Sequence, residues 1–222
     1  MANAKTREKL ILSAERLIAL RGTEGVSLRE INRAAGQRNA SALHYHFGSR
    51  QGLLEAVFEF RMERTNQRRN ELVDTIEADG VTGDLYRLCE ASVLPLAEML
   101  DANGAGHYIP FLAQVTADPL IRNSEVIVRE RWSGVRRLNR HILALLAQLP
   151  QRIALQRLTM SQGLVIYQLA EHQRQLNSAE APAAAETALF VSDLIDLKMA
   201  TLRAPVSPRT LAGLADLDRA DG

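Results

Sequence analysis

A capped helix, a glycine turn and a second short helix follow one another in the N-terminal part of the chain, and this pattern constrains the fold most. Ser27 and Glu30 have the spacing of a capping box, in which each side chain bonds to the backbone N–H of the other residue. Gly36 follows the last turn, where a residue with positive φ ends a helix without a Cβ clash. Leu43 then begins a second apolar face at helical spacing. The stretch up to Arg50 predicts a helix-turn-helix, which makes double-stranded DNA the first partner to consider.

An earlier amphipathic helix, expected from Thr6 to Arg21, completes a bundle of three helices. A bundle of ~45 residues is too small to be very stable alone, so a larger region must support it. Residues 1–50 hold nine Lys and Arg against four Glu, a net charge of +5, whereas residues 51–222 have a net charge of −4. A basic unit on a mildly acidic body is typical of a protein that offers one end to a polyanion.

The motifs of this region resemble the DNA-binding domain of TetR-family regulators over about residues 5–58. The matching pattern is Gly-x-x-Gly-Val-Ser-Leu-x-Glu-Ile, then Ala-Gly, then Ala-Leu-His-Tyr-His-Phe-Gly-Ser-Arg-x-Gly-Leu-Leu. Two departures are one additional residue between Gly36 and Leu43, and His44 where a first tyrosine is more usual. The resemblance implies an all-α fold, with an N-terminal three-helix helix-turn-helix domain and a C-terminal helical domain for ligand binding and dimerisation.

Residues that could contact DNA divide into two groups by their chemistry. Hydroxyls, helix N-termini and basic side chains suit phosphate oxygens, and the candidates are Ser27, Arg29, Tyr45, Ser49 and Arg50, with Lys5 and Arg7 on an expected flexible basic arm. Side chains that donate, accept or meet a thymine methyl group suit base edges, and the candidates are Arg38, Asn39, Ser41, Ala42 and His44, with His46 beside them. His44 and His46 point in different directions on a helix, so no metal site is expected there.

We expect three domains, with boundaries at 1–50, 51–203 and 204–222. After the first domain the pattern predicts a helix from Ser49 to about Ala78, one holding Leu85 to Leu100 with Pro95 as a kink or boundary, and a short element from Tyr108 to Val115. Further helices are expected over about 123–149, 151–176 and 182–202, and the tail from Ala204 is either frayed and flexible or a short appended helix.

A body of this size behind so small a DNA-binding unit suggests control by a small-molecule effector. A cavity between helices needs apolar walls and a few polar groups. Side chains of that character are Phe58, Met62, Leu88, Ser92, Tyr108, Phe111, Trp132, Asn139 and Tyr167. The same residue types at helical spacing also build solid cores, and this alternative stays open.

Apolar residues spread around more than half the circumference of the two helices expected near the C-terminus. Such helices must be covered on two sides, either as central helices of a monomer or by the same helices of a second chain. The resemblance favours the second arrangement, because those regulators are dimers built in this way. The candidate interface residues are Leu158, Val165, Leu189, Val191, Leu194, Ile195 and Met199.

The chain is therefore interpreted as a cytoplasmic, homodimeric, ligand-responsive regulator, most simply a repressor, on a pseudo-palindromic operator. The single cysteine permits no internal disulfide, no run of ~18 apolar residues suits a membrane, and no secretory leader is recognised. Common catalytic motifs are missing, so neither an enzyme nor a cofactor is expected. Two alternatives are an architectural or interaction protein of the same fold without an effector, and an all-helical enzyme.

Overall fold

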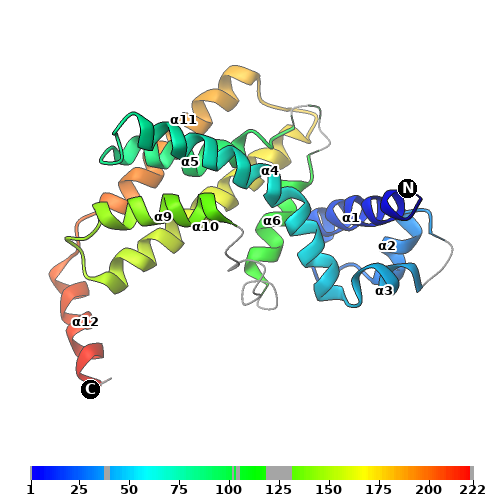
Figure 1. The fold of residues 1–222 in the computed structure, drawn as a ribbon, viewed down its shortest axis with the longest axis horizontal. Coiled ribbons are helices and arrows are strands. Elements are labelled where there is room, and N and C mark those ends of the chain that lie inside the picture. Colours follow the sequence, from blue (N-terminus) through cyan, green and yellow to red (C-terminus); the bar gives the residue numbers. More distant parts are fainter. Residues whose placement is uncertain (1, 38–40, 102, 104–105, 119–131, 221–222) are drawn as a thin grey trace.

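A computed structural model describes residues 2–37, 41–101, 103, 106–118 and 132–220, and every regular element within these ranges is a helix. The N-terminal half contains α1 (Ala2–Arg21), α2 (Leu28–Ala34), α3 (Ser41–Phe47), α4 (Arg50–Ala78), α5 (Leu85–Ala97) and α6 (Tyr108–Ala117). The C-terminal half contains α9 (Ser133–Leu145), α10 (Gln151–Leu176), α11 (Ala184–Arg203) and α12 (Pro208–Ala220). The all-α expectation is confirmed, and the two chain termini lie at opposite ends of the molecule (Figure 1).

Helices α1 to α3 and the first turns of α4 form an N-terminal unit around a small core of its own. Leu10, Ile31, Leu43 and other aliphatic side chains at helical spacing are completely or almost completely buried there. Gly36 has φ of +70°, as the turn after α2 requires. The capping and turn residues that predicted the helix-turn-helix thus form the expected local structure, and the apolar residues of the same segment pack into one core.

Helix α4 joins this unit to the body, which comprises the remainder of α4 and helices α5, α6, α9, α10 and α11 (Figure 1). Its 29 residues span ~43 Å at the usual helical rise. Arg61 of α4 donates from Nε and Nη2 to the buried carboxylate of Glu15 on α1, at 2.7 and 2.9 Å. Helix α6 packs against both α1 and α10. The N-terminal unit is thus attached to the body through α4 and α6 together.

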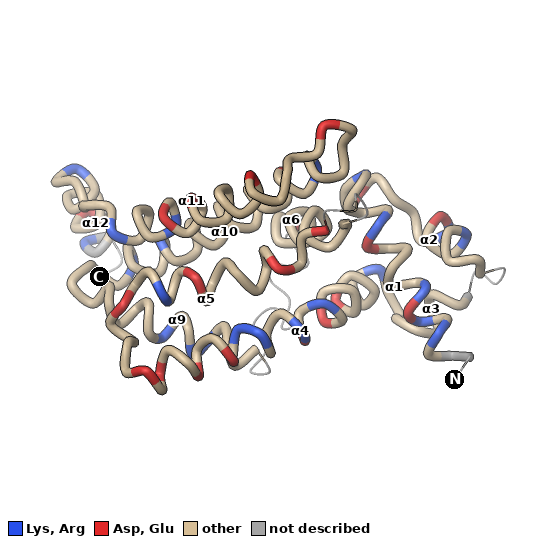
Figure 2. The backbone as a smooth tube through the Cα atoms, turned by 90° about the horizontal axis from the view of Figure 1, so that it is seen from above, with Lys and Arg blue, Asp and Glu red and all other residues tan. Residues whose placement is uncertain are grey.

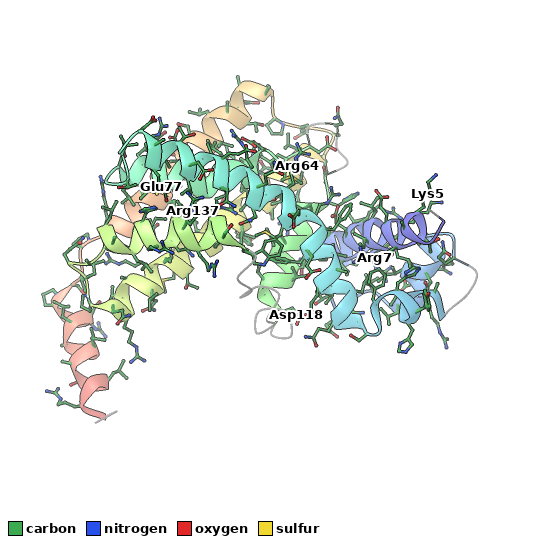
Figure 3. The ribbon with its side chains drawn as sticks, in the orientation of Figure 1. Lys5, Arg7, Arg64, Glu77, Asp118 and Arg137 are labelled. Carbon is green, nitrogen blue, oxygen red and sulfur yellow. The ribbon has the colours of Figure 1, made fainter. Side chains whose placement is uncertain are left out.

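Within the body, α9 lies close against the C-terminal half of α4. The backbone N–H of Gly134 donates to Asn66 Oδ1 at 3.0 Å, and Arg137 Nη2 lies 2.7 Å from carboxylate oxygens of both Asp74 and Glu77. Figure 3 shows Glu77 and Arg137 side by side where the two helices meet. A side chain larger than hydrogen at position 134 would crowd the α4 backbone, so this contact depends on glycine.

Helix α5 is buried by α4, α9 and α11. Its Cys89 has no exposed surface, and burial raises the pKa of the thiol to about 11. Pro95 lies inside α5 rather than at a boundary, two residues before the helix ends. Proline has no backbone N–H, so the carbonyl of Ala91, four residues earlier, receives no helical hydrogen bond from position 95.

Three further boundaries differ from the sequence prediction. Helix α1 begins at Ala2, so the expected flexible arm is helical. Helix α9 ends at Leu145 because the chain turns toward Pro150, and the part of the expected 123–149 helix over residues 123–131 lies outside the described residues. The tail forms α12, the second of the two alternatives that its sequence allowed.

Candidate nucleic-acid interface and interior cavity

The start of α2 is held by the capping box that its sequence predicts. Glu30 N–H donates to Ser27 Oγ at 3.2 Å, and Ser27 N–H donates to Glu30 Oε2 at 2.9 Å. The backbone bond from Ser27, its hydroxyl and the Arg21 guanidinium together lower the pKa of Glu30 to about 2. The Ser27 hydroxyl also donates to Glu30 at 2.8 Å, so a phosphate would compete with an internal bond for its proton.

Helix α3 presents polar and aromatic groups to solvent and is anchored from beneath by Leu43. Tyr45 is 76% exposed, and His44 is exposed beside it. The His46 ring lies 5.3 Å from the Tyr45 ring in an edge-to-face arrangement, and Ala42 is half-buried. The exposed side of this helix is therefore formed mainly by a phenol and an imidazole, which can both donate and accept hydrogen bonds.

Arg7 ties the beginning of α1 to the end of α3. Its guanidinium carbon lies 5.4 Å from the centre of the Phe47 ring, a cation–π contact, and Figure 3 shows Arg7 on the side of α1 that faces α3. Lys5 is exposed two residues closer to the N-terminus, on the other side of α1 (Figure 3). Both side chains start from a helix, which corrects the expectation of a flexible arm and gives their charges defined positions.

The first turn of α4 uses two of the expected phosphate contacts for its own structure. Ser49 Oγ caps the helix by accepting from Gly52 N–H at 3.0 Å. Arg50 Nη1 donates to the carbonyl of Val26 at 2.8 Å, and its Nη2 is buried without a partner. The Arg50 side chain therefore also holds the turn before α2, and its expected contact with DNA stays a prediction.

Helix α3 contains neither Lys nor Arg, whereas α1 and α2 both carry exposed basic side chains that could bind phosphate (Figure 2). Arg29 is exposed in the first turn of α2 and keeps its expected place. Arg38 and Asn39 lie outside the described residues, and so does the side chain of Ser41, although its backbone begins α3. Their base-reading roles stay predictions.

The body contains a cavity of about 580 Å³. Of the residues predicted for a ligand site, the wall includes Phe58, Met62, Ser92, Trp132, Asn139 and Tyr167. Phe58 and Trp132 meet edge to face, with ring centres 6.0 Å apart. The remaining three candidates, Leu88, Tyr108 and Phe111, are buried but lie outside the wall, because they fill contacts between helices instead.

Four polar residues of this wall were not predicted from the sequence: Arg69, Thr116, Thr159 and Gln162. A signal for Arg69 was present, because it lies seven residues from both Met62 and Ile76 on the buried side of α4. A charged residue on an apolar helical face is the unusual feature that should have been examined. Gln162 has no comparable signal.

The expected interface residues on α10 and α11 face different environments. Val165, Leu194 and Ile195 are buried within this chain, so a second chain cannot contact their side chains, and we correct their assignment to the internal core. Leu189 is 72% exposed, Val191 and Met199 are half-buried, and Leu158 lines the cavity. Exposed apolar residues that the prediction missed are Leu155, Met160 and Leu197.

Comparisons with known protein families agree with this arrangement. The model described as bacterial regulatory proteins of the tetR family matches residues 10–57, and the model described as tetracyclin repressor-like, C-terminal domain, matches residues 90–200, which is half of the chain. The chain belongs to the TetR family. A comparison with curated proteins gives no match.

Two solved structures are similar to this TetR-family chain. A chain assigned to the TetR-family transcriptional regulators from Rhodococcus sp. shares 18% identity with a TM-score of 0.53, over 87% of this chain and 98% of its own. Another chain with the same assignment, from Mesorhizobium loti MAFF303099, shares 16% identity with a TM-score of 0.44, over 90% of this chain and 98% of its own. The first likeness supports the fold.

The TetR family consists of DNA-binding transcriptional regulators, and the family and fold of this chain support that function. None of the described helices has the apolar length that a membrane span requires. Among the described residues, no three His, Cys, Asp or Glu side chains gather where they could hold a metal ion.

Proposed function

We propose that this TetR-family chain is a ligand-responsive repressor that acts as a homodimer on a pseudo-palindromic operator. The observation that carries the proposal is that one helix serves both sites. The Ser49 cap at the start of α4 directly follows α3, and Phe58, Met62 and Arg69 further along α4 form part of the cavity wall. A ligand that repositions α4 in the body would therefore also reposition the DNA-facing side of α3.

Contact with DNA is assigned to the exposed side of the N-terminal unit. Tyr45 would bind phosphate and His44 would read base edges, together with the predicted readers Arg38, Asn39, Ser41 and Ala42. Lys5, Arg7 and Arg29 supply positive charge beside them, and His46 supports the Tyr45 ring. The exposure of Tyr45, His44 and Arg29 supports this assignment.

The homodimer is assigned to α10 and α11, which pack against each other. Their exposed apolar side chains are Leu155, Met160, Tyr167, Leu189 and Leu197. A second copy covering this surface would place two α3 helices on one duplex, where successive major grooves on one face are ~34–36 Å apart.

The response to ligand follows as a shift between two arrangements of the dimer. A ligand that favours the arrangement with the wrong α3 spacing by ~3 kcal/mol weakens DNA binding more than 100-fold. The cavity supplies the place for such a ligand, and its volume lies within the usual range for small-molecule sites.

The DNA contacts are tested by selecting genomic fragments that the full-length protein binds at low salt, and by measuring variants on the selected duplex. We expect Tyr45→Phe to weaken all duplexes alike, and His44→Ala to relax the preference at particular base pairs. Failure to select any duplex would contradict DNA binding. Equal, sequence-independent losses in both variants would remove His44 from the base readers.

The dimer surface is tested by light scattering on Leu189→Glu/Leu197→Glu. Because both positions are exposed in one chain, the double variant should keep its helical content and become monomeric. Leu20→Glu, an equally exposed leucine on α1, is the matched control and should remain dimeric. A dimer that persists in the double variant would place the interface elsewhere.

A further inference from the structure

Arg69 of α4 is a buried cation that forms no ion pair with any residue that the structure describes. Its relative exposure is 4%, its Nη1 has no hydrogen-bond partner, and no carboxylate of the described residues pairs with it. Other arginines of the same helix are paired: Arg61 with Glu15, and Arg68 with Glu71 and Glu98. An unpaired buried charge is costly to keep, and an anion bound beside it would offset part of that cost.

The charge is present at neutral pH. Burial lowers the pKa of Arg69 to about 10, which still leaves the guanidinium protonated near pH 7. The apolar surroundings therefore strengthen its attraction for a negative group and do not remove it.

A second buried cation lies near enough to affect the same region. Lys198 of α11 has no exposed surface, and its Nζ bonds only to the Ser161 hydroxyl at 3.1 Å. Burial, with the Arg69 charge adding to it, lowers the pKa of Lys198 to about 8. This part of the interior consequently holds two positive groups, and neither forms an ion pair with a described residue.

Arg69 opens onto the cavity, and it is the charged residue of the described wall. The rest of that wall is mainly apolar, with Phe58, Trp132 and several aliphatic side chains. The neutral polar residues of the wall are Ser92, Thr116, Asn139, Thr159, Gln162 and Tyr167. Ser92 Oγ donates to Gln162 Oε1 at 3.2 Å, which leaves the Gln162 amide nitrogen as a donor. One cation in an apolar chamber is complementary to a molecule with one negative group and an apolar body.

We propose that the cavity binds an apolar monocarboxylate, whose oxygens accept hydrogen bonds from Arg69 while its hydrocarbon part packs against Phe58 and Trp132. A carboxylate fits better than a phosphate monoester, because the latter carries nearly two charges and Arg69 alone faces the chamber. The role of the bound molecule as the effector rests on the proposed function. The binding of a carboxylate beside Arg69 does not depend on that function.

The site is tested by calorimetry on the DNA-free, full-length protein. The probes are straight-chain carboxylates from hexanoate to dodecanoate and two aryl carboxylates, benzoate and phenylacetate. Each carboxylate is compared with its uncharged primary amide. Dodecyl phosphate is measured as well, to compare a phosphate with a carboxylate on the same hydrocarbon chain. We expect at least one carboxylate to bind at least tenfold tighter than its amide, since a bond to a charged group changes Kd by roughly ten- to hundredfold. A panel without any such preference overturns the proposal, and a preference for dodecyl phosphate over dodecanoate overturns the choice of carboxylate.

Arg69→Met should abolish the preference for carboxylate over amide, whereas Arg69→Lys should keep part of it. Arg64→Met is the matched control, because Arg64 is an exposed arginine on the same helix (Figure 3). Removing an unpaired buried charge should also raise the Tm of the ligand-free protein by about 2–4 °C. Survival of the preference in Arg69→Met, or a fall in its ligand-free Tm, would show that the fold itself satisfies Arg69.

The same carboxylate is then added to the protein–DNA complex. Binding to the free protein without release of DNA would contradict the ligand-controlled repressor and leave the Arg69 site intact. Release of DNA by the amides as strongly as by the carboxylates would contradict the Arg69 site and leave ligand control intact.

Discussion

The ion pair between Glu15 and Arg61 makes a prediction whose size follows from its geometry. The Glu15 side chain is 5% exposed, whereas that of Arg61 is 29% exposed and reaches water. Arg61→Met therefore leaves a buried carboxylate uncompensated, and we expect a loss of roughly 3–5 kcal/mol in the free energy of unfolding. Glu15→Gln leaves a cation that water can partly solvate and an amide that can still accept one bond, so its cost should be about 1–2 kcal/mol.

These costs are measured by urea unfolding followed by circular dichroism. With a slope of ~3 kcal/mol per molar urea at this chain length, Arg61→Met should lower the midpoint by about 1–1.7 M. The double variant Glu15→Met/Arg61→Met removes both charges, so it should recover most of the loss. The reasoning is refuted if Glu15→Gln costs as much as Arg61→Met, or if the double variant is as unstable as Arg61→Met.

Two further predictions concern single positions elsewhere in the fold. Gly134→Ala should lower the free energy of unfolding by about 1–3 kcal/mol in the same urea assay. The reason is that a Cβ would lie 3.0–3.1 Å from backbone and side-chain atoms of Asn66 and Asn70. An unchanged stability would show that α9 can move away from α4. The Glu30 carboxylate has a folded pKa of about 2, below its usual 4.5, so its contribution is present above pH 4.5 and is lost as the pH falls toward 2. Glu30→Gln keeps the cap without the charge, and its deficit relative to wild type should shrink over that pH range; a constant deficit would contradict the assignment.

Local signals allowed the N-terminal unit to be predicted from sequence. The capping box of Ser27 and Glu30 spans three residues, and the turn at Gly36 requires only the conformation of one residue. Such features need no knowledge of distant contacts. Arg50 shows the limit, because its partner is the carbonyl of Val26, 24 residues earlier, and nothing in the sequence near Arg50 indicates that bond.

In the body, apolar periodicity predicts less than it does in the N-terminal unit. It predicts that α10 and α11 are covered on two sides, but it does not predict which of those sides faces the core of the same chain. Val165 and Leu194 belong to that core, whereas Leu189 lies outside it. For Arg69 the periodicity of α4 indicates a buried position, but not the cavity beside it, because the wall of that cavity comes from several helices.

The buried thiol of Cys89 makes this protein convenient for spectroscopy. It is the single cysteine of the chain, it has no exposed surface, and its pKa of about 11 keeps it protonated under ordinary labelling conditions. A maleimide or nitroxide reagent is therefore expected to leave the native protein unmodified, without prior removal of cysteine. A cysteine introduced at exposed Leu20 would carry the only label. In the proposed dimer, spin–spin distances would then report how far apart the two N-terminal units lie, with and without an added carboxylate.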